Sequence, residues 1–327
     1  MTRRYTRGAW RSALGMVLAI GTTMALAQSY PTKPIRFIVA ASPTSPVDII
    51  SRWILDGMTA DLGQGFVVEN KVGGVYQIAL NEVLRAPADG YTMLVISLPV
   101  AVAPSIVDNY PIDLRKDFVT LARTVSSYNI LVVPNDSPAK SLAELIALLK
   151  ADPGKRSYVS GGPGTPAHVI GELFKQVVGL DVLHVPYLQL AQGVGDLIGG
   201  RIDYGFLTSA PMIPQIKGGK LRALAVTAPH RLPVIAEVPT VGEAGFPALQ
   251  VSDWALFLVK AGTPAAVIER LSAATRKVIT APSAPEALAK FGAEPNYLGP
   301  EEARRFFDVE IDRWAKVART GNIKLQP

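Results

Sequence analysis

The stretch IRFIVAASPTSPVDIISRWIL, residues 35–55, decides the fold because it joins an apolar strand to a helix through a short turn. Such turns often hold ligands in α/β proteins, since the first N–H groups of a helix have no partner within the helix. This turn contains no glycine. Ser45 is predicted to cap the helix, with Pro46 as its first residue and Asp48 as its third, an S-x-x-D pattern. The stretch predicts a stable helix start and leaves open whether the turn also meets a ligand.

The alternation of strand and helix continues along the chain. Apolar runs predict strands at 35–41, 66–69, 91–97, 129–134, 157–160, 182–186, 202–208, 221–227 and 251–260. Helical patterns lie between them, and consecutive helices are expected from about residue 263 onward. Unbroken apolar strands that alternate with helices favour parallel sheets covered on both faces. Because nine strands are many for one open sheet, we expect two α/β lobes, with ligands beyond the carboxyl ends of the strands.

The first 27 residues have the features of an export signal. Four arginines precede the apolar run SALGMVLAIGTTMALA, which ends in Ala25-Leu26-Ala27, the A-x-A pattern of a signal-peptidase site. The run is too short to predict a spanning helix. We therefore expect export and cleavage after Ala27. The Arg3-Arg4 pair keeps twin-arginine export open, but ordinary secretion is favoured because the rest of that motif is missing.

The charge of the chain gives no reason to expect nucleic acid or a membrane surface as a partner. The formal net charge is +6, but four of the 33 Lys and Arg residues belong to the leader, which has no acidic residue. The remaining 29, set against 27 Asp and Glu, leave +2 for residues 28–327. The chain has no cysteine, which excludes disulfides, thiolate metal sites and thiol nucleophiles.

Several kinds of chemistry lack their usual sequence patterns. The chain has no G-x-S-x-G, no G-x-x-x-x-G-K-[ST] and no G-x-G-x-x-G after a strand. Its three histidines have no H-E-x-x-H or H-x-H neighbours, so we predict neither a metal nor a cofactor. His184 lies in a predicted strand and is interpreted as a packed core residue, whereas His230 is expected to face solvent.

Residues 158–174, YVSGGPGTPAHVIGELF, form a second strand–turn–helix pattern, with the glycines that the first turn lacks. Glycine allows a ligand to approach the backbone closely. Thr165 is predicted to cap the helix, and unpaired N–H groups with the helix dipole would favour an anionic group there. A tight turn that only packs is equally compatible with the pattern. The candidate binding residues are Gly161, Gly162, Gly164, Thr165 and His168.

Other turns offer further candidate contacts. In ENKVGGVYQIAL, residues 69–80, Tyr76 either projects toward a cleft or packs at the helix start. Tyr187 and Thr208 each lie where a predicted strand ends, so their side chains can meet a ligand. The first turn still offers polar groups, which are those of Ser42, Thr44, Ser45 and Asp48.

These segments together resemble the Bug family of extracytoplasmic solute receptors, which are associated with tripartite tricarboxylate transporters. The matching blocks are YPTKPIRFIVA, VVENKVGG, APADGYTMLV, YVSGGPGTPAHVIGELF, HVPY, DLIGGRIDYGF, IKGGKLRALAVT, VPTVGEAGFP and W-x4-VKAGTP. The resemblance implies a type II periplasmic-binding-protein fold, with two α/β lobes around a ligand cleft that the chain crosses twice. We expect one lobe from residues 28–130 plus 254–327 and the other from residues 131–253.

The resemblance also implies a function. It predicts a periplasmic, monomeric, non-enzymatic protein that binds a small carboxylate and delivers it to a membrane permease of the tripartite tricarboxylate type. Members of the family hold the carboxylate largely with backbone amides and ordered water at the strand–helix turns. The Gly161–His168 turn matches the family well, and Trp254 is retained.

Departures from the family pattern cluster in the expected cleft. Glycines that are usual in the first two turns are replaced, and Val75 and Tyr76 stand where the second turn usually has glycine. The usual Lys-Gly after Tyr187 is replaced by Leu188 and Gln189, and the usual Asp near Thr208 is also replaced. We expect a carboxylate ligand with an apolar or aromatic body, or one that lacks a second carboxylate. Apolar surface for it is expected from Tyr76, Leu188 and Trp254.

Three functions remain to be compared. A transport receptor that closes on its solute by hinge motion is favoured. A degenerate receptor that signals to a membrane sensor is compatible with the altered cleft. A periplasmic enzyme using Asp48, His168 and Ser160 is disfavoured, because the sequence shows no ordered set of nucleophile, base and orienting group.

Overall fold

The structure is a computed structural model that describes residues 30–43, 45–187 and 189–325. The strands are β1 (Ile35–Val39), β2 (Phe66–Asn70), β3 (Thr92–Ser97), β4 (Phe118–Pro134), β5 (Ser157–Ser160), β6 (Leu183–Pro186), β7 (Gly205–Thr208), β8 (Leu221–Val226), β9 (Ser252–Lys260) and β10 (Ala293–Leu298). The α-helices are α1 (Pro46–Leu62), α2 (Gln77–Arg85), α3 (Leu98–Ile106), α4 (Leu142–Ala151), α5 (Pro166–Val178), α6 (Leu190–Ile198), α7 (Ser209–Lys217), α8 (Ala265–Ile279), α9 (Ala284–Ala289) and α10 (Pro300–Thr320). Single turns of 3-10 helix are η1 (Gly74–Tyr76), η2 (Pro233–Ile235) and η3 (Pro247–Leu249).

The predicted export signal lies outside the described residues, and so does the cleavage after Ala27. Within the described part of the chain, none of the helices combines the length and the apolar character needed to cross a membrane.

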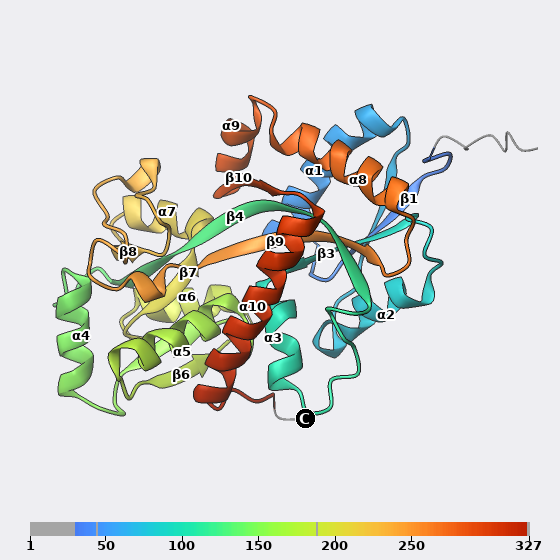
Figure 1. Ribbon diagram of the computed structural model, residues 1–327. Helices are drawn as coiled ribbons and strands as arrows, with labels where there is room; N and C mark the ends of the chain where they lie inside the picture. The colour runs from blue at the N-terminus through green and yellow to red at the C-terminus, as the bar shows by residue number, and fades with distance from the viewer. Residues whose placement is uncertain (1–29, 44, 188, 326–327) are drawn as a thin grey trace, which may run out of the picture.

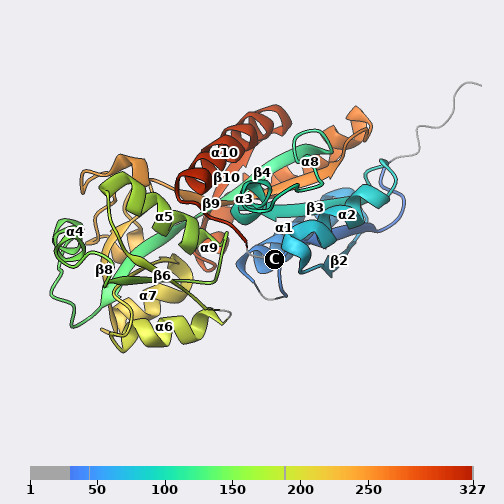
Figure 2. The same ribbon diagram turned by 90° about the horizontal axis from the view of Figure 1, so that it is seen from below.

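Two α/β lobes lie side by side, and the long strands β4 and β9 run between them (Figure 1). Lobe 1 contains β1–β3 and β10 with helices α1–α3, α8 and α9, and lobe 2 contains β5–β8 with helices α4–α7. In Figure 2, helices α4–α7 lie on one side of the molecule and helices α1, α2 and α8 lie on the other. The first part of β4, as far as Tyr128, pairs with β9. From Asn129 onward β4 pairs with β7 and β8 instead. The partners of β4 therefore change between these two residues, and the predicted lobe boundaries near residues 130 and 253 stay a prediction.

The expectation of purely parallel sheets is wrong for the strands that connect the lobes. β1 pairs in parallel with β2 and β3, and β5 pairs in parallel with β6. β9, however, is antiparallel to both β3 and β4. This follows from the chain path, since β4 carries the chain out of lobe 1 and β9 brings it back.

Strand β4 has 17 residues, whereas the sequence predicted only 129–134. Its first half was missed because Thr120, Arg123 and Ser126 interrupt the apolar pattern. All three side chains are nevertheless buried, with exposed fractions of 3%, 8% and 1%. Buried polar side chains therefore lie along β4 where it crosses between the lobes.

The prediction of helices after residue 263 is confirmed by α8, α9 and α10, but they are not consecutive, because β10 lies between α9 and α10. Its sequence, AEPNYL, has one proline and no apolar run, so no strand was expected. β10 pairs only with β4 in the described sheet, and the register shifts between Pro295 and Leu298. An edge strand tolerates proline in this way because one side of it needs no ladder hydrogen bonds.

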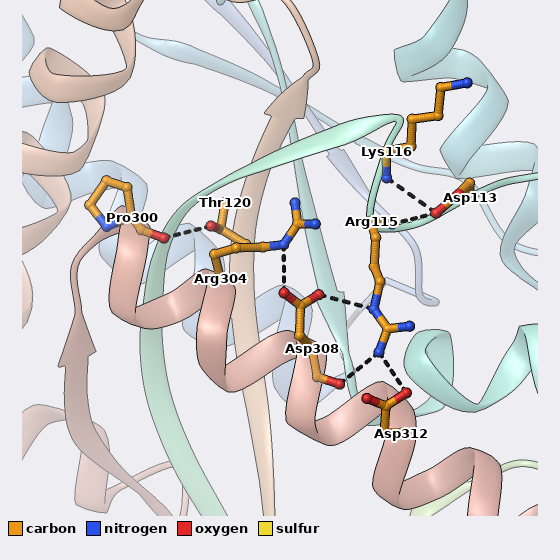
Figure 3. Close-up of polar contacts among 8 residues, drawn as sticks. All are labelled: Asp113, Arg115, Lys116, Thr120, Pro300, Arg304, Asp308 and Asp312. Carbon is orange, nitrogen blue, oxygen red and sulfur yellow. Dashed lines mark hydrogen bonds and ion pairs between the residues drawn. The ribbon is translucent and has the colours of Figure 1, made fainter.

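Helix α10 runs across the molecule and packs against α3 of lobe 1 and α5 of lobe 2 (Figure 1). Figure 3 shows how its first half is attached to the start of β4. Arg115 Nε donates to Asp308 at 3.0 Å, and Thr120 Oγ1 donates to the carbonyl oxygen of Pro300 at 2.8 Å. On the other lobe, Gln176 Nε2 donates to the carbonyl oxygen of Val317 at 2.9 Å. One helix thereby contacts both lobes along its length.

Candidate functional site

The carboxyl ends of the parallel strands bring the predicted ligand turns together in each lobe. In lobe 1, β1 pairs in parallel with both β2 and β3, so the turns that follow these strands are neighbours. In lobe 2, β5 pairs in parallel with β6, and a parallel bridge joins Tyr158 to Tyr204 just before β7. A Cβ atom on Gly164, in the β5–α5 turn, would lie 2.8 Å from Cδ1 of Ile106 at the end of α3. The β5–α5 turn thus touches lobe 1, and we call these turns together the candidate site.

The β1–α1 turn is a well-capped helix start, as predicted. Ser45 is the N-cap and accepts the N–H of Asp48 at 3.4 Å, with Pro46 in the first helical turn. The Asp48 carboxylate is 3% exposed and is bound by two neighbours. Arg52 Nε donates to it at 3.1 Å, and Asn70 Nδ2 donates at 2.9 Å. Its charge is therefore compensated inside the protein. Of the other predicted residues, Ser42 is exposed and Thr44 lies outside the described residues.

The β2–α2 turn keeps a glycine-like backbone although two of its residues are not glycine. Val75 and Tyr76 have φ angles of 48° and 70°, in the left-handed region. For residues with a Cβ atom this conformation costs about 1–2 kcal/mol each. Tyr110 Oη donates to the carbonyl oxygen of Val75 at 2.9 Å and helps to hold the turn.

Tyr76 was predicted either to face a cleft or to pack at the helix start. Its ring is partly buried and packs against the main hydrophobic core of the molecule. Burial and the nearby Asp253 carboxylate raise the pKa of Tyr76 to about 12. The phenol is therefore uncharged at neutral pH, and its ring is packed against the core beside an acidic group.

Asp253 belongs to this site and was missed by the sequence analysis. Its carboxylate accepts the N–H of Trp254 at 3.0 Å and lies beside the N–H of Leu98, the first residue of α3. Burial raises the pKa of Asp253 to about 6. An acidic side chain of the protein itself thus lies beside the N-terminus of α3. The only signal in the sequence is a lone acidic residue at the start of an otherwise buried strand.

The β5–α5 turn has the predicted shape, but two of its amides already donate to side chains of the protein. The N–H of Gly162 donates to Ser160 Oγ at 2.9 Å, and the N–H of Gly164 donates to His168 Nδ1 at 3.1 Å. Gly162 and Gly164 have φ angles of 108° and 76°, which explains why glycine is needed here, whereas Gly161 does not have a positive φ. The expectation that unpaired N–H groups make this turn an anion cradle is therefore wrong for these two donors.

Thr165 is at the predicted N-cap position, yet its side chain does not accept a hydrogen bond from the helix. Its hydroxyl instead donates to the carbonyl oxygen of Gly162 at 2.7 Å. His168, three residues further on, accepts from the turn in its place. Nδ1 of His168 must therefore carry no proton, because a protonated ring nitrogen cannot accept a hydrogen bond.

Behind this turn the rings of His168 and His184 are stacked, with their centroids 4.0 Å apart. His184 Nε2 lies 2.6 Å from Ser160 Oγ. Burial is the main cause that lowers the pKa of each histidine to about 4. Both rings are therefore neutral at neutral pH. His184 is only partly buried, and its ring also stacks on Tyr158, so its interpretation as a packed residue agrees with the structure.

The arrangement does not support the enzyme that the sequence left open. Ser160 is 0% exposed, so its hydroxyl cannot reach a substrate in this structure. Asp48 is bound by Arg52 in another turn. Among the described residues there is also no group of three or more His, Cys, Asp or Glu side chains placed to hold a metal ion.

Three further predicted residues have different surroundings. Tyr187 Oη donates to Asp196 at 2.7 Å, within lobe 2. Thr208 is the N-cap residue of α7, without a side-chain cap. Trp254 was expected to offer stacking surface to a ligand, and this is wrong for the structure, because its indole is 2% exposed. Its Nε1 donates to Glu310 at 2.7 Å. Leu188 lies outside the described residues.

Comparison with known proteins identifies similar chains. Residues 50–323 match the model of the tripartite tricarboxylate transporter family receptor. The chain is 32% identical over 302 residues to Protein BugT of Bordetella pertussis, covering 92% of this chain and 93% of BugT. Two similar solved structures carry ligands. Rpa4515 of R. palustris with adipate has a TM-score of 0.79 and 29% identity, over 90% of this chain and 99% of that one. MatC (Rpa3494) from Rhodopseudomonas palustris with bound malate has a TM-score of 0.75 and 25% identity, over 88% and 99%.

Proposed function

Because this chain belongs to the tripartite tricarboxylate transporter receptor family, which includes Bug proteins, we propose that it captures a small carboxylate and delivers it to a membrane permease of that type. Similar structures hold adipate and malate, both small carboxylates. Receptors of this family are periplasmic solute-binding proteins, and we place this chain in the periplasm as a monomer.

The binding step uses the two lobes and the strands between them. A carboxylate enters between the lobes and contacts the candidate site on both sides. Rotation of lobe 2 relative to lobe 1 about β4 and β9 then closes the site over it, as in other hinged receptors. The left-handed Val75 and Tyr76 fix the lobe 1 turn in advance, so little order is lost when the ligand binds.

The ligand of this chain carries one carboxylate and an apolar body. The observation that carries this proposal is the Asp253 carboxylate, which lies beside the N–H of Leu98 at the start of α3. Asp253 would also repel a second ligand carboxylate placed near α3, since like charges in a site with little water oppose each other strongly. The packed ring of Tyr76 beside it supplies apolar surface.

Thermal unfolding of residues 28–327 against a panel of acids tests this proposal. The panel holds aliphatic dicarboxylates, acidic amino acids, aromatic and aliphatic monoacids, and neutral amides of the same shape. A ligand at one hundred times its Kd adds about 2.7 kcal/mol to the free energy of unfolding, which shifts Tm by several degrees. We expect monoacids with an apolar body to give the largest shift.

The variant Asp253→Asn provides the matched control. It keeps an acceptor for the N–H of Leu98 but removes the negative charge, so dicarboxylates are expected to gain affinity relative to monoacids. If compact dicarboxylates bind the unchanged protein best, the single-carboxylate proposal is refuted and the receptor function stands. If no acid in the panel shifts Tm, the receptor function itself loses its support.

A further inference from the structure

A cavity lies where the chain crosses between the lobes, apart from the candidate site. It has a volume of about 240 Å³ and is lined by polar residues of β4, β9 and β10 and of the segments that follow β8 and precede β9. The residues that matter here are Arg123, Ser126, Tyr128, Thr227, Ser252 and Asn296. No Asp or Glu side chain lines it. The cavity therefore combines one positive charge with hydroxyl and amide groups.

Arg123 is buried without a carboxylate partner. Its exposed fraction is 8%, and its guanidinium lies over the ring of Phe306, 4.1 Å from the centroid. Nη2 donates to Ser126 Oγ at 2.6 Å and to Ser252 Oγ at 3.1 Å. Nε is buried and, within the described part of the chain, has no hydrogen-bond partner. Both accepting groups are neutral hydroxyls, so nothing that touches the guanidinium balances its charge.

The acidic groups nearest to this cavity are engaged elsewhere. Glu310 acts on Arg123 through its charge, but its carboxylate accepts the indole N–H groups of Trp254 at 2.7 Å and of Trp314 at 3.0 Å. Glu294 lies 2.8 Å from His230 Nε2. A buried cation without a paired anion is expensive, because it loses its hydration without a compensating charge.

We propose that this cavity is a binding site for a small inorganic anion such as chloride, with Arg123 as its principal ligand. The Asn296 amide donates one N–H to Ser126 Oγ at 2.9 Å and has a second N–H to offer an anion. The Thr227 hydroxyl, which accepts the N–H of Asn129 at 3.0 Å, can still donate its own proton. The hydroxyls of Ser126 and Ser252 already orient the guanidinium. An anion there removes the cost of the unpaired charge. The lining, which has one guanidinium group and several hydroxyl and amide groups, favours an anion.

The position of the cavity gives the anion a structural consequence. Arg123 and Asn296 belong to β4 and β10, which pair in lobe 1, whereas Thr227 follows β8 of lobe 2. Residues from both lobes therefore line the same cavity. An ion bound to both sides therefore stabilises the arrangement of the crossing strands. This site is independent of the proposed solute, and its test is made without any solute.

The test is thermal unfolding of residues 28–327 at a constant ionic strength of about 0.2 M, with chloride replacing gluconate stepwise. Gluconate, which is bulky and carries a diffuse carboxylate charge, serves as the reference anion. We expect chloride to raise Tm by about 2–4 °C or more, with saturation. Bromide in place of chloride should give an anomalous scattering peak beside Arg123 in crystals.

Two variants decide where the anion acts. Arg123→Met removes the buried charge and should abolish the chloride-dependent rise in Tm. Arg304→Gln is the matched control, because Arg304 on α10 is partly exposed and already paired with Asp308, and its response to chloride should equal that of the unchanged protein. If Arg123→Met does not fold, Asn296→Leu, which removes one donor from the cavity wall, should weaken the apparent chloride affinity at least severalfold.

Several outcomes would overturn the proposal. They are an absence of any chloride effect beyond gluconate, an equal chloride effect in Arg123→Met, and bromide peaks only at surface positions. A rise in Tm with formate but none with chloride or bromide would show that the cavity takes carboxylates, and would also refute an inorganic anion site.

Discussion

Acidification should weaken the β5–α5 turn through its two stacked histidines. Burial lowers the pKa of His168 and of His184 to about 4, against about 6.5 in an unfolded chain. Because the folded pKa values are the lower ones, folding favours the neutral rings. Their contribution to stability is complete above about pH 6.5 and is lost as the pH falls through 6.5 toward 4.

The size of this loss follows from the two pKa values. Near pH 5 an unfolded histidine is almost fully protonated and a folded one is mostly neutral, which costs about 2 kcal/mol per histidine. Both together give about 4 kcal/mol, a large part of the stability of an ordinary domain. Protonation of His168 would also remove the acceptor for the N–H of Gly164, so the turn itself should open.

Urea unfolding near pH 7.5 and near pH 5, followed by tryptophan fluorescence, measures the effect. His168→Asn is the decisive variant, because an amide oxygen can accept from Gly164 but does not take up a proton in this range. Its stability should fall by about 2 kcal/mol less than that of the unchanged protein between the two pH values. His184→Gln, which keeps a polar group near Ser160, should behave in the same way.

The variants must be compared with one another because Asp253 changes the stability in the opposite direction over the same range of pH. Its pKa is raised to about 6, so its protonation stabilises the folded protein as the pH falls. The double variant His168→Asn/His184→Gln should lose less stability on acidification than either single variant. The reasoning would be refuted if both single variants and the double variant lost as much unfolding free energy between pH 7.5 and pH 5 as the unchanged protein.

Three further predictions concern single side chains. Asp253→Asn should raise the free energy of unfolding near pH 7.5 by at most about 3 kcal/mol, because the raised pKa of about 6 means that the ionised carboxyl costs stability. That gain should shrink as the pH falls below 6 in urea titrations, and a constant gain would contradict the assignment. Gly164→Ala should cost more than Gly179→Ala in thermal unfolding. Both positions have left-handed φ angles, so alanine costs about 1–2 kcal/mol of stability at each. Only at Gly164 would the new Cβ also meet Ile106. Equal costs at the two positions would show that this contact is unimportant. Trp254→Phe should lower the free energy of unfolding by about 1–3 kcal/mol, because it removes a hydrogen-bond donor from the buried Glu310. Calorimetry should show an unchanged Kd for the solute. A large change in Kd would place Trp254 at the ligand.

The sequence predicts local features of this fold well where one pattern has one physical meaning. The N-cap at Ser45 was found because a short hydroxyl residue before proline at a helix start has few other uses. Strand β5 was predicted with its observed bounds, since a short apolar segment before a glycine turn has little freedom. The first half of β4 was missed because its buried polar residues acquire partners only from distant segments, as Arg123 does from Ser252.

The same limit applies to the candidate site. The turn at 161–168 was found from its glycines, but the fate of its amides depends on side chains that reach back after folding, such as His168 onto Gly164. Asp253 is far in sequence from α3, and no local pattern shows that its carboxylate meets Leu98. Trp254 was carried over from a family pattern, which records that a residue is retained and not which side of a strand it faces.

Three helices that begin at the candidate site have a side chain of the protein beside an N–H in or just before their first turn. Ser45 accepts in α1, His168 accepts in the turn before α5, and Asp253 lies beside the N–H of Leu98 at the start of α3. A ligand carboxylate that used one of these donors would have to displace the side chain and leave it without a partner. Displacing Ser45 leaves a hydroxyl, which water can solvate, and displacing His168 leaves a neutral ring. Only at α3 would the displaced group be a second negative charge beside the ligand, so Asp253 is the residue that most restricts which acids this receptor accepts.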